Sequence, residues 1–214
     1  HAMRAVVGAR FGGPEVLAVR EVPAPRPGPG QILVETRAAG LNFADVLARL
    51  GVYKGAPPRP FVPGIEVAGL VESLGEGVTG FTPGDRVMGF CAFGGYAEKV
   101  VLRADAAWKM PPDMGFPEAA ALPVQYLTAW HGLFTLGQLR SGETLLVHAA
   151  AGGVGIACLQ LAGEVGAKVF ATVGSRDKLA VVRRESPDAR VVFYREEDFE
   201  PIVRRETDGR GVRV

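Results

Sequence analysis

The stretch Leu145-Leu-Val-His-Ala-Ala-Ala-Gly-Gly-Val-Gly155 decides the fold of the second half of the sequence. Its short apolar run predicts a β-strand, and the glycines predict a tight turn. The spacing of Val154, Cys158, Leu161 and Val165 then predicts a helix over 154–165. Glycines at such a turn let a backbone approach a phosphate, and the helix N-terminus offers unpaired N–H groups. The pattern predicts a dinucleotide site, although a tight turn in any α/β protein would look similar.

The spacing of the glycines follows the dinucleotide-binding fingerprint G-x-G-x-x-G. In this register Ala150 takes the first position, Gly152 the second and Gly155 the third, and Gly153 and Val154 lie between them. We expect these five residues to bind a cofactor. No Lys-Ser or Lys-Thr pair follows the glycines, which excludes a Walker A loop.

The end of the next predicted strand, 168–173, bears on which dinucleotide is bound. An NAD site places an Asp or Glu there to bind the ribose hydroxyls. This sequence instead offers a hydroxyl and two cations, Ser175, Arg176 and Lys178, which are groups that bind a 2′-phosphate. Asp177 is expected to cap a helix over 177–184. The sequence favours NADPH, and the alternative for the two cations is an ordinary solvated helical turn.

The rest of the chain predicts two kinds of architecture. After residue 139, strands expected at 144–149, 168–173 and 191–194 alternate with helices, the last at 198–206, and 211–214 begins another strand. This alternation indicates a parallel sheet. Before residue 123, short strands separated by Gly and Pro turns indicate an irregular barrel or sandwich. These strands are expected at 4–9, 16–22, 32–38, 65–74, 85–90 and 96–102. Asn42 is expected to cap a helix that runs to Leu50, and Pro123 to break a helical segment that starts at Phe116.

Composition excludes several classes of function. The 214 residues carry 24 basic and 23 acidic side chains, so the chain has no basic footprint for nucleic acid. Two uncharged stretches, 119–139 and 144–163, are interrupted by polar residues and glycines, which predicts buried core and no membrane span. Cys91 and Cys158 form no C-x-x-C motif, which favours buried free thiols in a reducing, cytoplasmic compartment.

Four motifs in order carry a resemblance to a known family. They are Ala39-Gly-Leu-Asn-Phe-Ala-Asp45, Pro63-Gly-Ile-Glu-Val-Ala-Gly69, Gly77-Val-Thr-Gly-Phe-Thr-Pro-Gly-Asp-Arg-Val87 and Ala149-Ala-Ala-Gly-Gly-Val-Gly155. The sequence resembles the zinc-independent quinone oxidoreductase branch (zeta-crystallin-like and VAT-1-like) of the medium-chain dehydrogenase/reductase superfamily. The resemblance implies a GroES-like catalytic domain over 1–123 and an NADP(H)-binding Rossmann domain over 124–214. It also implies NADPH-dependent reduction of quinones or α,β-unsaturated carbonyls, and a homodimer for the full-length form.

The zinc chemistry of related alcohol dehydrogenases is not expected here. Those enzymes place Cys and His where this chain has Asn42 and Ile65, and they carry a four-cysteine loop that it lacks. Neither residue replaces a thiolate or an imidazole as a zinc ligand. Hydride transfer is therefore expected to depend on positioning and hydrogen bonds.

The resemblance also implies roles for single residues. Asn42 and Tyr53 correspond to residues that line the nicotinamide and substrate cleft, Thr128 to a residue near the cofactor, and Tyr194 to one beside the 2′-phosphate. From the residues alone, Asn42 could equally be only a helix cap and Tyr53 only a packing aromatic. We expect Glu66, Asp85 and Arg86 to be structural, and His131 and His148 to be core or strand-end residues.

Three hypotheses about activity follow. The first is an NADPH-dependent quinone or enone reductase, with an enoyl-thioester reductase as its near neighbour. The second is a non-catalytic NADPH-binding protein. The third is an inactive truncated reductase, because a six-stranded Rossmann sheet would here be truncated after the third strand. On that hypothesis, NADPH binding would be weak and turnover small.

Overall fold

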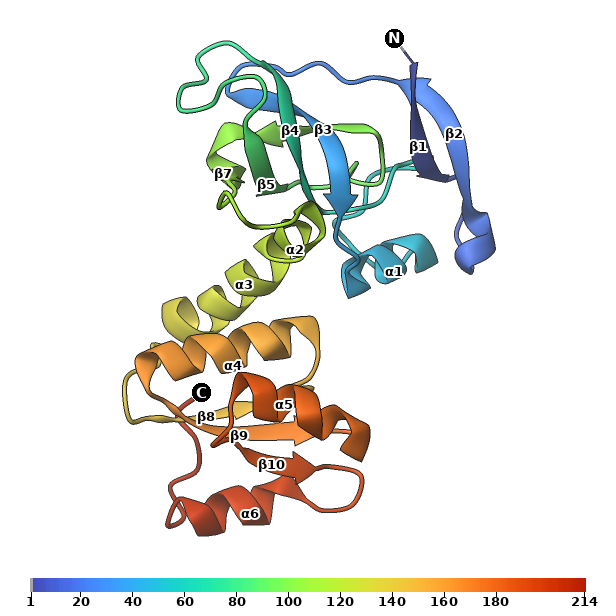
Figure 1. Cartoon of the computed structure of the whole chain (residues 1–214). Helices are drawn as coiled ribbons and strands as arrows, with labels where there is room; N and C mark the ends of the chain where they lie inside the picture. The colour runs from blue at the N-terminus through green and yellow to red at the C-terminus, as the bar shows by residue number, and fades with distance from the viewer. Residues whose placement is uncertain (1) are drawn as a thin grey trace. The chain divides into compact units, whose positions relative to one another are not determined.

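The computed structural model describes residues 2–214 and divides into two compact units (Figure 1). The first unit ends at Val124, and the second runs from Gln125 to Val214. The first is built around an antiparallel half-barrel and the second around a parallel sheet, which confirms the predicted fold class. No helix in the described part of the chain has the length and apolar character that crossing a bilayer requires.

The first unit contains a five-stranded antiparallel sheet in the order β6-β3-β4-β5-β7 and a separate β1-β2 ribbon. Two β-bulges interrupt the pairing of β3 with β4, where the sheet curves. The core lies inside this curve, where Ile32, Val34, Val67 and Leu102 are almost fully buried. The strands are β1 (Ala2–Gly8), β2 (Leu17–Pro23), β3 (Gln31–Ala39), β4 (Glu66–Leu74), β5 (Arg86–Phe90), β6 (Lys99–Arg103) and β7 (Ala107–Lys109).

Two differences from the sequence prediction have local causes. The strand expected from residue 96 begins only at Lys99, because the backbone of 94–96 hydrogen-bonds to the loop 62–64 at 2.9–3.0 Å. The short strand β7 escaped prediction, since three residues cannot display an alternating pattern. The helix α1 (Phe43–Leu50) begins after Asn42 as predicted and ends at Gly51, whose φ of 82° suits glycine.

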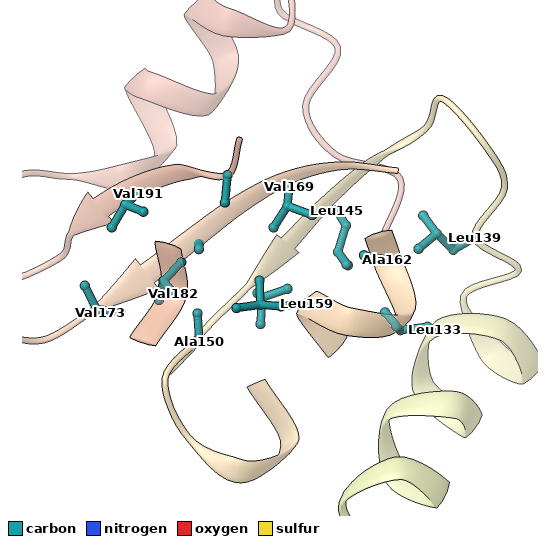
Figure 2. Packing of buried hydrophobic residues seen from close by; sticks show 13 residues of the cluster. Leu133, Leu139, Leu145, Ala150, Leu159, Ala162, Val169, Val173, Val182 and Val191 are labelled. Atoms are coloured by element: carbon teal, nitrogen blue, oxygen red, sulfur yellow. The ribbon is translucent and has the colours of Figure 1, made fainter. Parts of the chain in front are cut away.

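The second unit contains three parallel strands in the order β10-β9-β8, joined by helices. The helices α4 and α5 pack on the sheet face that carries Leu145, Val169 and Val173, and Leu159 of α4 lies at the centre of this core (Figure 2). The elements are α3 (Pro123–Trp130), β8 (Thr144–Val147), α4 (Gly153–Val165), β9 (Lys168–Val173), α5 (Leu179–Glu185), β10 (Arg190–Phe193) and α6 (Phe199–Glu206).

The helix break predicted at Pro123 is confirmed. The helix α2 (Phe116–Ala120) ends just before it, and α3 starts at the proline itself. Proline is well suited to a first helical position, where its missing N–H is not needed. A π-helical segment, His131–Leu136, continues α3.

Several predicted boundaries in the second unit are wrong. The first strand ends at Val147 and not at residue 149, because the chain turns there into the glycine loop. Residues 211–214 form no regular strand, yet the backbone N–H of Arg213 donates to the Thr144 carbonyl at 2.8 Å and that of Leu146 to Val214 at 2.9 Å. The chain therefore lies along the edge of β8 there.

Candidate functional site

The glycine loop joins the end of β8 to the start of α4. Ala149 adopts a left-handed conformation with a φ of 50°, and its carbonyl accepts a hydrogen bond from the Gly152 N–H at 2.8 Å. Gly152 then caps α4 in an extended conformation. The first N–H groups of α4 lie within this turn, and such groups have no acceptor inside their own helix. The loop thus presents the donors that a pyrophosphate requires.

Gly155 makes the closest approach in this loop. A Cβ atom on Gly155 would lie 2.5 Å from the Ala149 carbonyl oxygen and 2.7 Å from the Ala150 Cα atom. Both neighbours are backbone atoms and cannot turn away. The first turn of α4 packs against the end of β8 only because residue 155 has no side chain, as the third position of the fingerprint requires.

A cavity of about 440 Å³ runs along the glycine loop within the second unit. Its lining is largely apolar, and it brings Thr128 of α3 together with the four loop residues Gly152–Gly155. The structure therefore assembles five of the expected cofactor residues at one place. Ala150, another of the expected residues, is fully buried beneath the loop and contributes through its backbone position.

A second cavity, of about 670 Å³, lies at the carboxyl ends of β8, β9 and β10. His148 and Ala149 line both cavities, so both border the start of the glycine loop. The Nδ1 atom of His148 lies 2.9 Å from the Thr172 hydroxyl, and its ring packs edge-on against Phe199 at a centroid distance of 4.9 Å. Exposed Tyr194 lines the same cavity.

The sequence analysis did not predict that His148 and Thr172 line this second cavity. Their positions at the ends of neighbouring parallel strands could have indicated it, because these ends meet at one edge of the sheet. The expectation of a strand-end residue is right for His148. The expectation of a core or strand-end residue is wrong for His131, which is exposed at the start of the π-helical segment.

The polar residues after β9 form a short 3₁₀ turn, Arg176–Lys178, in front of α5. Asp177 lies inside this turn and caps no helix, which corrects the sequence prediction. A hydrogen bond with Ser175 holds the pKa of Asp177 below its usual value. The Tyr194 hydroxyl approaches the turn as well, since a Cβ on Gly174 would lie only 2.8 Å from it. Ser175, Arg176, Lys178 and Tyr194 therefore gather at the ends of two adjacent strands.

Arg176 is held in place by groups from the neighbouring strand. Its guanidinium donates to both oxygens of Glu196, at 3.2 and 2.5 Å, and its central carbon lies 4.6 Å from the centre of the Phe193 ring. Sequence reasoning did not identify Glu196, because the pairing depends on the register of β9 and β10.

Around Asn42, the first unit holds a buried polar network. The Asn42 Nδ2 atom donates to Glu66 at 2.8 Å, and the Val124 N–H donates to the other oxygen of the same carboxylate at 2.8 Å. Asp45 accepts from the Asn42 N–H at 3.0 Å, from the Gly64 N–H at 2.9 Å and from a tyrosine hydroxyl at 2.9 Å. The network fixes the start of α1 against β4, and the two hydrogen bonds to Glu66 are those that a structural role requires.

Burial shifts the ionisation of this network. Burial raises the pKa of Glu66 above its usual value, and hydrogen bonds from Val124 and Asn42 oppose the rise. Burial also raises the pKa of Tyr96, which bonds to Asp45, and raises that of the Cys91 thiol to about 12. Cys91 is buried as expected.

Cys158 is only half-buried, so the expectation of two buried thiols holds for Cys91 alone. Its thiol lines the cavity along the glycine loop, and burial raises its pKa.

Tyr53 lies in the loop after α1 and is 39% exposed. Its ring packs edge-on against Phe93, with centroids 6.3 Å apart. Asn42, by contrast, is buried in the network with Glu66. Tyr53 and Asn42, the two residues expected in the substrate cleft, thus contact different sets of residues within the same unit.

No metal-binding constellation occurs in residues 2–214, where no three His, Cys, Asp or Glu side chains are grouped to hold an ion. At the two positions where related alcohol dehydrogenases carry zinc ligands, this chain has Asn42, which donates to a carboxylate, and Ile65, which is buried and apolar. The side chains themselves are unsuited to bind zinc.

Residues 28–112 match the family model described as "Alcohol dehydrogenase GroES-like domain". The synaptic vesicle membrane protein VAT-1 homolog of Rattus norvegicus is 46% identical over 176 residues, which cover 81% of this chain and 44% of the relative. The quinone oxidoreductase of Rattus norvegicus is 38% identical over 215 residues, which cover 99% of this chain and 65% of the relative.

A solved structure gives the same result. The crystal structure of Escherichia coli quinone oxidoreductase complexed with NADPH superposes with a TM-score of 0.89 at 36% identity, covering 98% of this chain and 64% of that one. The chain belongs to the zinc-independent quinone oxidoreductase branch of the medium-chain dehydrogenase/reductase superfamily. It spans about half to two thirds of the length of these relatives.

The raised pKa of Glu66 leads to a prediction about stability and pH. Between its unfolded value of 4.5 and its higher folded value, the native state binds more protons than the unfolded state. The contribution of Glu66 to the free energy of unfolding therefore falls as pH rises through this window. Glu66→Gln stays neutral, so the stability of the wild type relative to this variant should be greater at pH 5 than at pH 8.

The measurement is urea unfolding followed by Trp108 fluorescence in a Trp130→Phe background. Of the two tryptophans in the sequence, Trp108 reports on the first unit. If the stability of the wild type relative to Glu66→Gln stays constant or grows toward pH 8, the pKa of Glu66 is not raised in the folded protein.

Proposed function

We propose that the protein containing this chain reduces quinones or α,β-unsaturated carbonyls with NADPH, by hydride transfer that uses no zinc. The observation that carries the proposal is the glycine loop, where Gly155 packs against backbone atoms and which two cavities border. Relatives named as quinone oxidoreductases, one of them solved with NADPH, support it.

The residues of the second unit fit this cofactor. In our proposal, the N–H groups of Gly153, Val154 and Gly155 bind the pyrophosphate, Gly152 lets the backbone approach it at the start of α4, and Ala150 shapes the turn beneath it. When bound, NADPH supplies the hydride. The cavity beside the loop supports this, because its largely apolar lining suits the nicotinamide ring.

The polar residues that follow β9 and β10 in the same unit are proposed to recognise the 2′-phosphate of NADPH. Ser175 and Tyr194 offer hydroxyls, and Arg176 and Lys178 offer positive charge. Thr128 is proposed to bind near the nicotinamide end, since it lines the cavity along the glycine loop.

The first unit is proposed to supply the substrate side of the site. We assign the catalytic and substrate domain to 1–123 and the cofactor domain to 124–214. Tyr53, with its exposed ring, would donate its hydroxyl proton to a hydrogen bond with the substrate carbonyl, and Asn42 would line the same cleft. A conjugated acceptor suits such a site, because its developing negative charge is delocalised without a metal.

We also propose a cytoplasmic location and a homodimer for the whole protein. The free cysteines Cys91 and Cys158 suit a reducing compartment. The second candidate function, non-catalytic binding of NADPH, is favoured by the 46% identity to a protein named for synaptic vesicle membranes and not for a reaction.

Turnover assays separate the two functions. NADPH oxidation is measured with quinones, small enones and an enoyl thioester, and a reductase should oxidise NADPH with members of the first two groups. Binding of NADPH without turnover of any acceptor would favour the second function. Failure to bind NADPH at all would contradict both.

Tyr53→Phe tests the proposed catalytic hydroxyl. Loss of one donor to the developing oxyanion should lower kcat/KM for the best acceptor by about tenfold or more, with little effect on NADPH binding. Trp108→Phe changes another partly exposed aromatic of the same unit and should leave kcat/KM unchanged. Equal rates for the wild type and Tyr53→Phe would remove the hydroxyl from the mechanism.

A further inference from the structure

The adenosine end of the proposed cofactor site contains an ion pair that no part of the proposed function explains. Arg176 follows β9, and Glu196 follows β10. The guanidinium binds both carboxylate oxygens and lies over the ring of Phe193. The turn that carries Glu196 is itself fixed, because the Glu196 N–H donates to the Phe193 carbonyl at 2.8 Å. Arg176 is therefore held by two partners from one neighbouring strand end.

The charges around this pair are predominantly negative on the β10 side. Glu196, Glu197 and Asp198 follow one another along the chain, and all three line the cavity at the strand ends. Arg195 carries positive charge in the same lining. A 2′-phosphate with a charge of about −1.5 to −2 at neutral pH would meet this acidic run. A 2′-hydroxyl, by contrast, can donate a hydrogen bond to a carboxylate.

We propose that Glu196 is a specificity-determining residue. Its carboxylate pairs with the Arg176 guanidinium and thereby reduces the factor by which NADPH binds more tightly than NADH. The inference rests on the proposed function, because it assumes that the adenosine ribose binds at this edge. To bind the 2′-phosphate, Arg176 must exchange one anionic partner for another, so part of its attraction for NADPH is offset. NADH requires no such exchange.

Glu196→Gln tests the inference by equilibrium titration of the 214-residue chain with NADPH and with NADH, followed by cofactor fluorescence. The side chain keeps its shape and loses its charge. Exposed ion pairs contribute about 0.2–1 kcal/mol, or a factor of up to about five. We expect the Kd of NADPH to fall by about threefold to fivefold, and that of NADH to change by less than about twofold.

Glu197→Gln is the matched control. It removes the same charge from the next residue in the same cavity lining, and none of the ion pairs among residues 2–214 includes Glu197. Its effect on NADPH should be less than half that of Glu196→Gln. Equal effects of the two variants would show that general charge, and not the pair with Arg176, sets the preference.

A double-mutant cycle with Arg176→Gln decides whether the effect passes through the guanidinium. In the Arg176→Gln background, Glu196→Gln should change the Kd of NADPH by less than about twofold. An undiminished effect there would overturn the inference, and so would weaker NADPH binding by Glu196→Gln alone. If the wild type binds NADPH but Glu196→Gln alters neither cofactor, this inference fails and the proposed function stands. If the wild type binds neither cofactor, both fail.

Discussion

Gly155→Ala should weaken NADPH binding by the second unit and destabilise that unit. The added Cβ would lie 2.5 Å from the Ala149 carbonyl oxygen, so the first turn of α4 must move away from the end of β8. Overpacking of this kind costs about 1–3 kcal/mol. We expect the Kd of NADPH to rise at least about tenfold, which corresponds to about 1.4 kcal/mol. The measurements are NADPH titration and urea unfolding followed by Trp130 in a Trp108→Phe background.

The same helix supplies a control for this substitution. A Cβ on Gly163 would meet no atom within 4 Å, and Gly163 lies in α4 two turns further on. Gly163→Ala should therefore stabilise the unit by about 0.5–1 kcal/mol and leave NADPH binding unchanged. If Gly155→Ala binds NADPH as well as the wild type does, the loop is a tight turn without a part in cofactor binding.

Asp45→Ala should strongly destabilise the first unit. The carboxylate is 5% exposed and accepts from the backbone N–H groups of Asn42 and Gly64 and from the Tyr96 hydroxyl. Alanine would leave the two buried backbone N–H groups without this acceptor, and each such loss costs about 1–3 kcal/mol. The part-buried Tyr96 hydroxyl would keep the Gly40 carbonyl, which lies 3.2 Å from it. We expect the free energy of unfolding to fall by about 3–5 kcal/mol, measured by urea unfolding with Trp108 fluorescence in the Trp130→Phe background.

Asp113→Ala removes the same group from an exposed position of the same unit. Surface substitutions of this kind change stability by about 0.5 kcal/mol or less. A fall of less than about 1 kcal/mol for Asp45→Ala would mean that the network around Asn42 adds little to the stability of α1 and the loop at Gly64.

Much of the fold could be predicted because local signals and tertiary structure agree. The apolar run before the glycine loop forms β8, Pro123 starts α3, and Asn42 precedes α1, as their residue types indicate. The prediction failed where a distant partner decides the outcome. Tyr96 was expected to begin a strand, yet its N–H donates to the Pro63 carbonyl in the loop 62–64 instead.

The candidate site was predictable to the same degree. The fingerprint glycines and Thr128 come together along one cavity, because the motif itself describes a strand, a turn and a helix. The interactions of Asp177 and Arg176 could not be predicted. Asp177 bonds with Ser175 within the 3₁₀ turn, and Arg176 pairs with Glu196 across two strands whose register the sequence does not reveal.

Titration of the 214-residue chain with NADPH and with NADH tests the central claim most directly. The glycine loop and the hydroxyls and cations after β9 predict saturable binding of both, with NADPH bound more tightly. They also predict that Gly155→Ala binds NADPH at least about tenfold more weakly than the wild type, and that Gly163→Ala binds it equally well. Absence of NADPH binding, or NADH bound as tightly as NADPH, would contradict the account.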